Sequence, residues 1–188
     1  MPSLIEVAKA EIGYTETGNN DTKYGDWYEL NNQPWCAMFV SWCYDKAGLV
    51  GKVRSQSKKG FASCAHGLKF FAETNKLIPV GQAKAGDIAF FQFDKDAEPD
   101  HVGIIKFNNT ALKYLQVIEG NTSADKSGSQ SNGDGVYLKR RSYSLVMAVA
   151  RVKRIMVLMR NDRKRNNWYC RWRKHFNRDW IAGSTLGY

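Results

Sequence analysis

The hydrophobic pattern of the chain changes its period once, and this change limits the folds that the chain can adopt. Up to about residue 75, apolar residues recur at helical spacing. From residue 86 onward they gather in short runs rich in β-branched and aromatic residues. Helices and strands that occur in separate blocks are typical of an α+β domain. The sequence therefore predicts N-terminal helices packed on an antiparallel β-sheet.

Local signals place the helices. Ser3 and Glu6 match a capping box at the start of the first helix, and Gly13 ends that helix. Pro34 precedes a second apolar segment, and Gly48 stands where a C-cap glycine is expected. The amphipathic N-terminus lacks a basic start and a continuous apolar run, so it does not resemble a secretory signal. We expect helices over residues 4–12, 35–47 and 62–75, and a polar, turn-rich loop over residues 17–34.

Five short apolar segments, bounded by Gly, Pro, Asp and Asn, are expected to form the strands of the sheet. They cover residues 86–93, 101–107, 114–121, 135–143 and 145–152. A polar loop over residues 122–135 separates the third segment from the fourth. The domain is expected to end near Val152, which gives a folded domain over residues 1–152 and a separate segment over residues 153–188.

Cys36 is the strongest candidate for a reactive group. It follows Pro34-Trp35 at the predicted start of a helix, where the helix dipole and the free backbone N–H groups favour a thiolate. Cys43 lies two turns further along the same helix and is expected to be a core thiol. Cys64 is a weaker rival, because it also stands near a helix start but has no charged neighbour that the sequence identifies. No C-x-x-C pair occurs, so a zinc site is not expected.

A cysteine nucleophile needs a base and a group that orients the base. His101 opens one predicted strand and Glu119 ends the next one. In an antiparallel hairpin these two positions lie side by side, so Glu119 is placed to hold the imidazole of His101. The alternative is that His101 is structural and Glu119 is an ordinary charge at a strand end.

These segments, taken together, resemble the CHAP family of amidases and peptidases, which are relatives of the NlpC/P60 and papain-like enzymes. The resemblance extends over about residues 4–152, and the matching blocks occur in the family's order. The blocks are Lys23-Tyr24-Gly25-Asp26-Trp27-Tyr28, Pro34-Trp35-Cys36-Ala37-x-Phe39-Val40-Ser41-Trp42-Cys43, Gly86-Asp87-Ile88-x-Phe90-Phe91 with His101-Val102-Gly103-Ile104, and Ile118-Glu119-Gly120-Asn121.

The resemblance implies a papain-like CHAP fold and a catalytic set of Cys36, His101, Glu119 and Asn121. Asn121 is the least specific of these residues, since it could equally be a turn residue after the strand. The implied activity is a cysteine-dependent cleavage of peptidoglycan, either at the muramoyl-L-alanine amide or within the stem peptide or cross-bridge. Small size and the absence of a recognisable signal peptide suit a phage endolysin, made in the host cytoplasm and acting on the wall after release.

Other functions stay open at this point. A virion-associated lysin or a bacterial wall-remodelling enzyme would use the same chemistry in another setting. A wall-binding module with an idle cysteine belongs to a different class, and the presence of all three triad residues weighs against it. The sequence does not distinguish an amidase from an endopeptidase.

Some CHAP domains bind calcium in the loop before the cysteine. In this chain Asp21 and Asp26 are the candidate ligands. However, Lys23 lies between them, and its charge opposes a second cation. Asx-rich loops also form turns without a metal. We therefore expect no cofactor and no metal.

The C-terminal segment differs in charge from the rest of the chain. Residues 153–188 carry ten Lys and Arg against two Asp, which is +8 of the total net charge of +10. The segment also contains an aromatic residue at every fourth position: Trp168, Trp172, Phe176 and Trp180. This pattern is typical of an interfacial helix that binds an anionic wall polymer or membrane. Packing on the domain or oligomerisation is the main alternative, and no specific nucleic acid is expected as a partner.

Overall fold

The computed structural model describes residues 1–152, apart from residues 95 and 126. The expectations for residues 153–188 lie outside the described residues. Helix α1 (Leu4–Ala10) begins at the predicted capping box: Oγ of Ser3 accepts a hydrogen bond from the backbone of Glu6, and the Glu6 carboxylate accepts one from the backbone of Ser3. Leu4, Val7 and Ala8 form its buried face.

Two further helices were predicted, and one was missed. α3 (Cys36–Lys46) and α4 (Cys64–Glu73) form where expected. α2 (Lys23–Tyr28) lies inside the segment expected to be a loop, so that expectation was wrong there. Six residues are too few to show a helical period, although the hydroxyl of Thr22 caps the helix by accepting from the N–H of Gly25 at 3.0 Å. None of the helices in the described part of the chain has the length and apolar character needed to cross a bilayer.

The strands form one sheet in the order β1-β6-β2-β3-β4-β5, with every neighbouring pair antiparallel. β1 was not predicted, because two residues carry no alternation. The strands are β1 (Leu77–Ile78), β2 (Ile88–Phe91), β3 (His101–Asn109), β4 (Tyr114–Thr122), β5 (Gly135–Ser142) and β6 (Val146–Ala150). Short 3₁₀ helices cover Val50–Lys52, Val80–Gln82 and Tyr143–Leu145.

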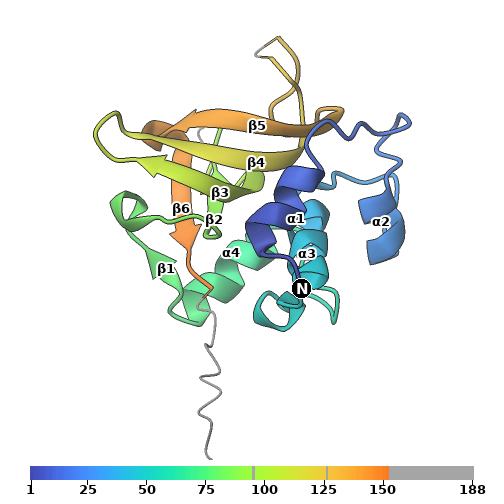
Figure 1. Cartoon of the computed structure of the whole chain (residues 1–188), viewed down its shortest axis with the longest axis horizontal. Helices are drawn as coiled ribbons and strands as arrows, with labels where there is room; N and C mark the ends of the chain where they lie inside the picture. Colours follow the sequence, from blue (N-terminus) through green and yellow to red (C-terminus); the bar gives the residue numbers. More distant parts are fainter. Residues whose placement is uncertain (95, 126, 153–188) are drawn as a thin grey trace, which may run out of the picture. The chain divides into compact units, whose positions relative to one another are not determined.

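Alternation along the strands divides the core into two layers. Ile88 and Phe90 of β2 pack in the larger cluster with the helices, whereas Ala89 and Phe91 belong to a second cluster with other strand residues. α1 and α3 contact β3, and α4 contacts β6, so these helices cover one face of the sheet (Figure 1). The predicted α+β class, with N-terminal helices packed on an antiparallel sheet, is confirmed.

One glycine allows α3 to approach the sheet closely. A Cβ atom on Gly120 of β4 would lie 2.6 Å from the ring of Trp35 and 2.7 Å from that of Phe39. Separations this short are sterically forbidden, so only glycine lets the first turn of α3 pack against β4. This contact brings Cys36, the first residue of α3, close to the strand that carries Glu119.

Candidate active site

An aromatic cluster holds the corner at which α3 begins. Trp35 is fully buried and stacks on Tyr24 with ring centroids 5.2 Å apart. Its indole N–H donates to a carboxylate oxygen of Glu16 at 3.0 Å, which satisfies the only polar group of the side chain. Trp35 also occupies the N-cap position of α3. The position of Cys36 is therefore fixed by the packing of its neighbour.

Groups from α3, α4 and β3 surround the Cys36 sulfur and favour a thiolate. No side chain caps the helix, so its first N–H groups are not satisfied by a capping oxygen. A hydrogen bond from the Cys64 thiol lowers the pKa of Cys36, and contact with His101 and the backbone N–H of Ala37 lowers it further. Burial opposes this change, but the pKa of Cys36 is still well below 9.0.

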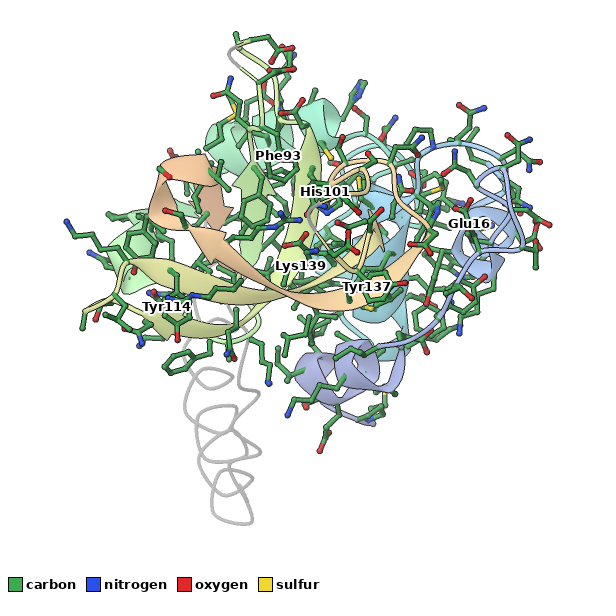
Figure 2. All side chains as sticks on the ribbon, turned by 90° about the horizontal axis from the view of Figure 1, so that it is seen from above. Glu16, Phe93, His101, Tyr114, Tyr137 and Lys139 are labelled. Carbon is green, nitrogen blue, oxygen red and sulfur yellow. The ribbon has the colours of Figure 1, made fainter. Side chains whose placement is uncertain are left out.

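His101 and Glu119 are in contact, as predicted from their places at the start of one strand and the end of the next. Nε2 of His101 lies 3.1 Å from Oε2 of Glu119, and both side chains are fully buried. The ring is turned away from ideal hydrogen-bond geometry at both nitrogens, as is common for catalytic groups without substrate. His101 lies beside Phe93 at one end of the sheet, with ring centroids 5.9 Å apart (Figure 2).

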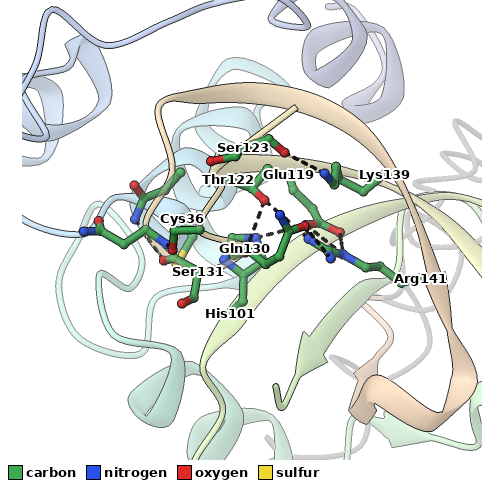
Figure 3. A network of polar contacts seen from close by, with 12 residues as sticks. Cys36, His101, Glu119, Thr122, Ser123, Gln130, Ser131, Lys139 and Arg141 are labelled. Carbon is green, nitrogen blue, oxygen red and sulfur yellow. Dashed lines mark hydrogen bonds and ion pairs between the residues drawn. The ribbon is translucent and has the colours of Figure 1, made fainter. Parts of the chain in front are cut away.

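The charge state of this pair follows from its contacts. Burial alone would lower the pKa of His101, but the neighbouring Cys36 sulfur and Glu119 carboxylate raise it to about 9. Burial would raise the pKa of Glu119, but its contacts with His101 and Arg141 outweigh burial and lower it. Cys36, His101 and Glu119 therefore favour a thiolate, an imidazolium and a carboxylate at neutral pH. The three residues appear together in Figure 3.

Gly103 leaves the space that the Glu119 side chain occupies. A Cβ atom on Gly103 would lie 2.6 Å from Cγ of Glu119 and 2.6 Å from a methyl group of Val117. Glycine at this position of β3 therefore lets the carboxylate lie along the strand toward His101. This requirement explains the glycine in the segment His101-Val102-Gly103-Ile104.

Asn121 is buried at the end of β4 in a left-handed backbone conformation, with φ of 60°. Its Nδ2 donates to the carbonyl of Ser131 at 3.3 Å, whereas its Oδ1 has no hydrogen-bond partner. A buried acceptor without a partner carries a free-energy cost. Asn121 therefore lies two residues beyond Glu119 on β4, with one polar atom still available.

Two residues of the site were missed or undervalued in the sequence. Arg141 of β5 is 5% exposed, and its guanidinium group binds the Glu119 carboxylate through Nε and Nη2. The alternating pattern of β5 shows an inward-facing arginine but not its partner. Sγ of Cys64 lies 3.6 Å from Sγ of Cys36, so Cys64 belongs to the site, although no sequence pattern indicates that the two cysteines are neighbours.

The loop before Cys36 satisfies its carboxylates without a cation. Nδ2 of Asn31 donates to Oδ1 of Asp21 at 2.5 Å and to Oδ1 of Asp26 at 2.8 Å. The Asn31 amide cannot turn over freely, because its Oδ1 accepts from the backbone N–H of Thr22 at 3.0 Å. An amide NH₂ group therefore lies between the two carboxylates, where a calcium ion would require an oxygen. These residues, as arranged, do not fit Ca²⁺.

This arrangement predicts that calcium does not stabilise the domain. The melting temperature of the protein is expected to be the same in millimolar calcium and in excess chelator, because a ligand that binds only the native state would raise it. Differential scanning calorimetry in the two buffers tests this expectation. A melting temperature that rises with calcium concentration would show that the ion displaces the Asn31 amide, and would contradict this expectation.

Comparison with known proteins identifies the family. The model of the CHAP domain matches residues 27–121, which is half of the 188-residue chain. The chain therefore belongs to the CHAP domain family, whose members are typically amidases or endopeptidases of peptidoglycan. This membership implies a cysteine-dependent hydrolase of cell-wall peptides.

The comparison with solved structures gives a protein described as similar to a lipoprotein of the NLP/P60 family, from Staphylococcus aureus subsp. aureus Mu50. Its identity to this chain is 17%, and its TM-score is 0.42. The match covers 80% of this chain and 40% of that one, so the chain spans less than half of the length of that protein. No curated protein sequence is significantly similar to the chain.

The paired charges of Cys36 and His101 predict the pH dependence of the activity. As the pH falls through the lowered pKa of Cys36, the thiolate takes up a proton and the rate falls. As the pH rises through about 9, His101 loses its proton, can no longer protonate a leaving amine, and the rate falls again. We expect a bell-shaped profile of kcat/KM whose two limbs belong to the coupled pair. A rate that rises steadily through pH 9 would contradict this assignment.

Proposed function

We propose that the protein hydrolyses an amide bond of bacterial peptidoglycan, with Cys36 as nucleophile, His101 as general acid and base, and Glu119 as the group that orients His101. The observation that carries the proposal is the contact between His101 and Glu119 at 3.1 Å, beside a cysteine at an uncapped helix start. Membership of the CHAP family supports the choice of peptidoglycan as substrate.

The mechanism follows from these positions. The Cys36 thiolate attacks the carbonyl carbon of the amide, and the free N–H groups of the first turn of α3 stabilise the oxyanion that forms. The imidazolium of His101 protonates the leaving amine, so the C–N bond breaks and a thioester remains on Cys36. His101, now neutral, takes a proton from water, which hydrolyses the thioester. The cycle consumes one water molecule and restores the ion pair.

The hydrogen bonds of Asn121 limit the role that this residue can take. Its unpartnered Oδ1 is a hydrogen-bond acceptor, so it suits an N–H group of the substrate or the proton of an attacking water. It does not suit an oxyanion, which needs donors. Asn121 is therefore proposed as a group that orients substrate or water.

Purified peptidoglycan tests the proposal directly. The wild-type protein is expected to release new amino groups without new reducing sugar ends, because it cleaves amides and not glycosidic bonds. Mass spectrometry of the products then distinguishes the two subclasses. A stem peptide with a new N-terminal alanine identifies a muramoyl-L-alanine amidase, whereas a free amine within the stem or bridge identifies an endopeptidase. New reducing ends would contradict the proposal.

The setting of the activity is a separate proposal. Release of the enzyme from a host cell during lysis, as in a phage endolysin, is one setting for this chemistry, and a virion-associated or wall-remodelling enzyme would use the same site. Binding of wall polymer or membrane by residues 153–188 rests on the charge and the aromatic spacing of that segment. A pull-down of the chain with and without this segment on purified walls tests it. Equal binding of the shortened chain would contradict the proposal.

A further inference from the structure

Arg141 is bound to the carboxylate that orients the histidine. Its Nε lies 3.0 Å from Oε1 and 3.2 Å from Oε2 of Glu119, and its Nη2 lies 2.6 Å from Oε2. This forked contact is the geometry in which an arginine fixes both the position and the plane of a carboxylate. Both side chains are buried, so solvent does not screen the interaction as it would on the surface.

One carboxylate oxygen of Glu119 contacts two partners. Oε2 lies 2.6 Å from Nη2 of Arg141 and 3.1 Å from Nε2 of His101. Arg141 therefore determines where the oxygen that faces the histidine lies. The guanidinium group also lies 4.9 Å from the ring centre of Phe93, which itself packs beside His101.

The same arginine reaches the loop after β4. Nη1 donates to Oε1 of Gln130 at 3.0 Å, and Nη2 lies 3.4 Å from Oγ of Thr122. The hydroxyl of Thr122 donates in turn to the carbonyl of Gln130 at 3.2 Å. Figure 3 shows this network of contacts around Glu119. Arg141 thus connects the carboxylate to two segments that border the site.

We propose that Arg141 is a positioning residue for catalysis, which holds the Glu119 carboxylate ionised and aimed at His101 without touching the substrate. The proposal rests on the function proposed above, because it assigns a purpose to the same site. Its alternative is that Arg141 only stabilises the fold by neutralising a buried charge. The two differ in what happens to the titration of Cys36 and His101 when the guanidinium group is removed.

Two substitutions separate charge from geometry. Arg141→Met removes the positive charge, so Glu119 should take up a proton at higher pH and stop stabilising the imidazolium. We expect kcat/KM near neutral pH to fall by about 10- to 100-fold, with the acidic limb of the profile shifted to higher pH. Arg141→Lys keeps the charge but not the fork, so it should keep the acidic limb of the wild type and lower kcat. Arg140→Met, at the preceding and exposed residue of β5, is the matched control.

A second readout works without any substrate. The rate at which iodoacetamide alkylates Cys36 reports the fraction of thiolate, and Arg141→Met is expected to shift its apparent pKa whereas Arg140→Met is not. If the wild type cleaves no peptidoglycan but this shift is found, the proposed function fails and the positioning role stands. Two results together would overturn the proposal and show that Arg141 is merely structural. The alkylation profile of Arg141→Met would match that of the wild type, and its loss of activity would equal the fraction of the sample that is unfolded.

An independent observation concerns the two cysteines of the site. Cys64 is the first residue of α4 and is partly exposed, while Cys36 is 4% exposed. Their sulfur atoms lie 3.6 Å apart although 28 residues separate them in the chain. A thiolate beside a second thiol is the arrangement in which oxidation ends in a disulfide and not in higher oxides.

We infer that a hydroperoxide converts Cys36 and Cys64 into a disulfide that reversibly stops catalysis. The Cys36 thiolate attacks the peroxide oxygen, the O–O bond breaks, and Cys36 becomes a sulfenic acid while hydroxide or alkoxide leaves. The Cys64 sulfur then attacks the Cys36 sulfur, and water leaves as the S–S bond forms. Two thiols are oxidised and one peroxide is reduced. A thiol reductant reverses the reaction.

Treatment with hydrogen peroxide followed by dithiothreitol tests this inference in the full chain. The wild type is expected to lose activity and regain most of it, and peptide mapping before reduction should give a Cys36–Cys64 disulfide. Cys64→Ser should lose activity without regaining it, because Cys36 then proceeds to the sulfinic acid. Cys43→Ser and Cys170→Ser are the matched controls and should recover as the wild type does. Full recovery of Cys64→Ser, or mapping that finds no such disulfide, would overturn the inference.

Discussion

Replacement of Cys36 by alanine is expected to slow the release of amino groups from purified peptidoglycan by about four orders of magnitude or more. Alanine removes the sulfur that forms the thioester, so the start of α3 no longer carries a nucleophile. The remaining rate of amide hydrolysis would come from substrate binding and oxyanion stabilisation alone. The measurement is the initial rate of amine release at equal concentrations of folded protein.

Cys43→Ala provides the matched control for this experiment. Cys43 lies in the same helix and is fully buried, but it is part of the core and not of the site. Burial raises its pKa well above 9.0, so it is an inert thiol. The variant is expected to lose about 1 kcal/mol of stability and to keep its activity. Activity of folded Cys36→Ala within tenfold of the wild type would show that Cys36 is not the nucleophile.

Glu119→Gln is expected to reduce both activity and stability, and for different reasons. The amide cannot stabilise an imidazolium as a carboxylate does, so kcat is expected to fall by about 10³- to 10⁴-fold. The substitution also leaves the buried guanidinium group of Arg141 without a counter-charge. Loss of one partner of a buried ion pair destabilises a protein by about 3–5 kcal/mol. Urea unfolding measures the second effect and kinetics the first.

The double variant Glu119→Gln with Arg141→Met separates the two effects. Removal of the unpaired guanidinium group is expected to restore part of the lost stability, because no guanidinium charge is then buried without a counter-charge. Activity is expected to stay low, because the imidazolium is still unsupported. If Glu119→Gln alone proves as active as the wild type, the orienting role of Glu119 is wrong, whatever its stability.

The features that the sequence predicted best are those that depend on neighbouring residues. The capping box at Ser3 and the start of α3 at Cys36 are local, and both are confirmed. The contact between His101 and Glu119 also follows from local order, since one strand begins and the next one ends at the same edge of the sheet. A hairpin fixes that neighbourhood whatever the rest of the fold does.

The features that the sequence did not reveal depend on distant segments. Arg141 reaches Glu119 only because β5 pairs with β4 in a register that follows a long loop. Cys64 meets Cys36 because two helix starts converge, which no periodicity can show. α2 was missed because a helix of six residues has no readable repeat. In each case the missing information is tertiary packing and not local propensity.

Alkylation of Cys36 is the measurement that tests the central claim most directly. The protein is treated with limiting iodoacetamide at several pH values, the labelled cysteine is identified by peptide mapping, and amine release is measured on the same samples. Cys36 is expected to react before Cys43, with an apparent pKa well below 9.0, and activity is expected to fall in proportion to its labelling. Full labelling of Cys36 with activity retained would contradict the account.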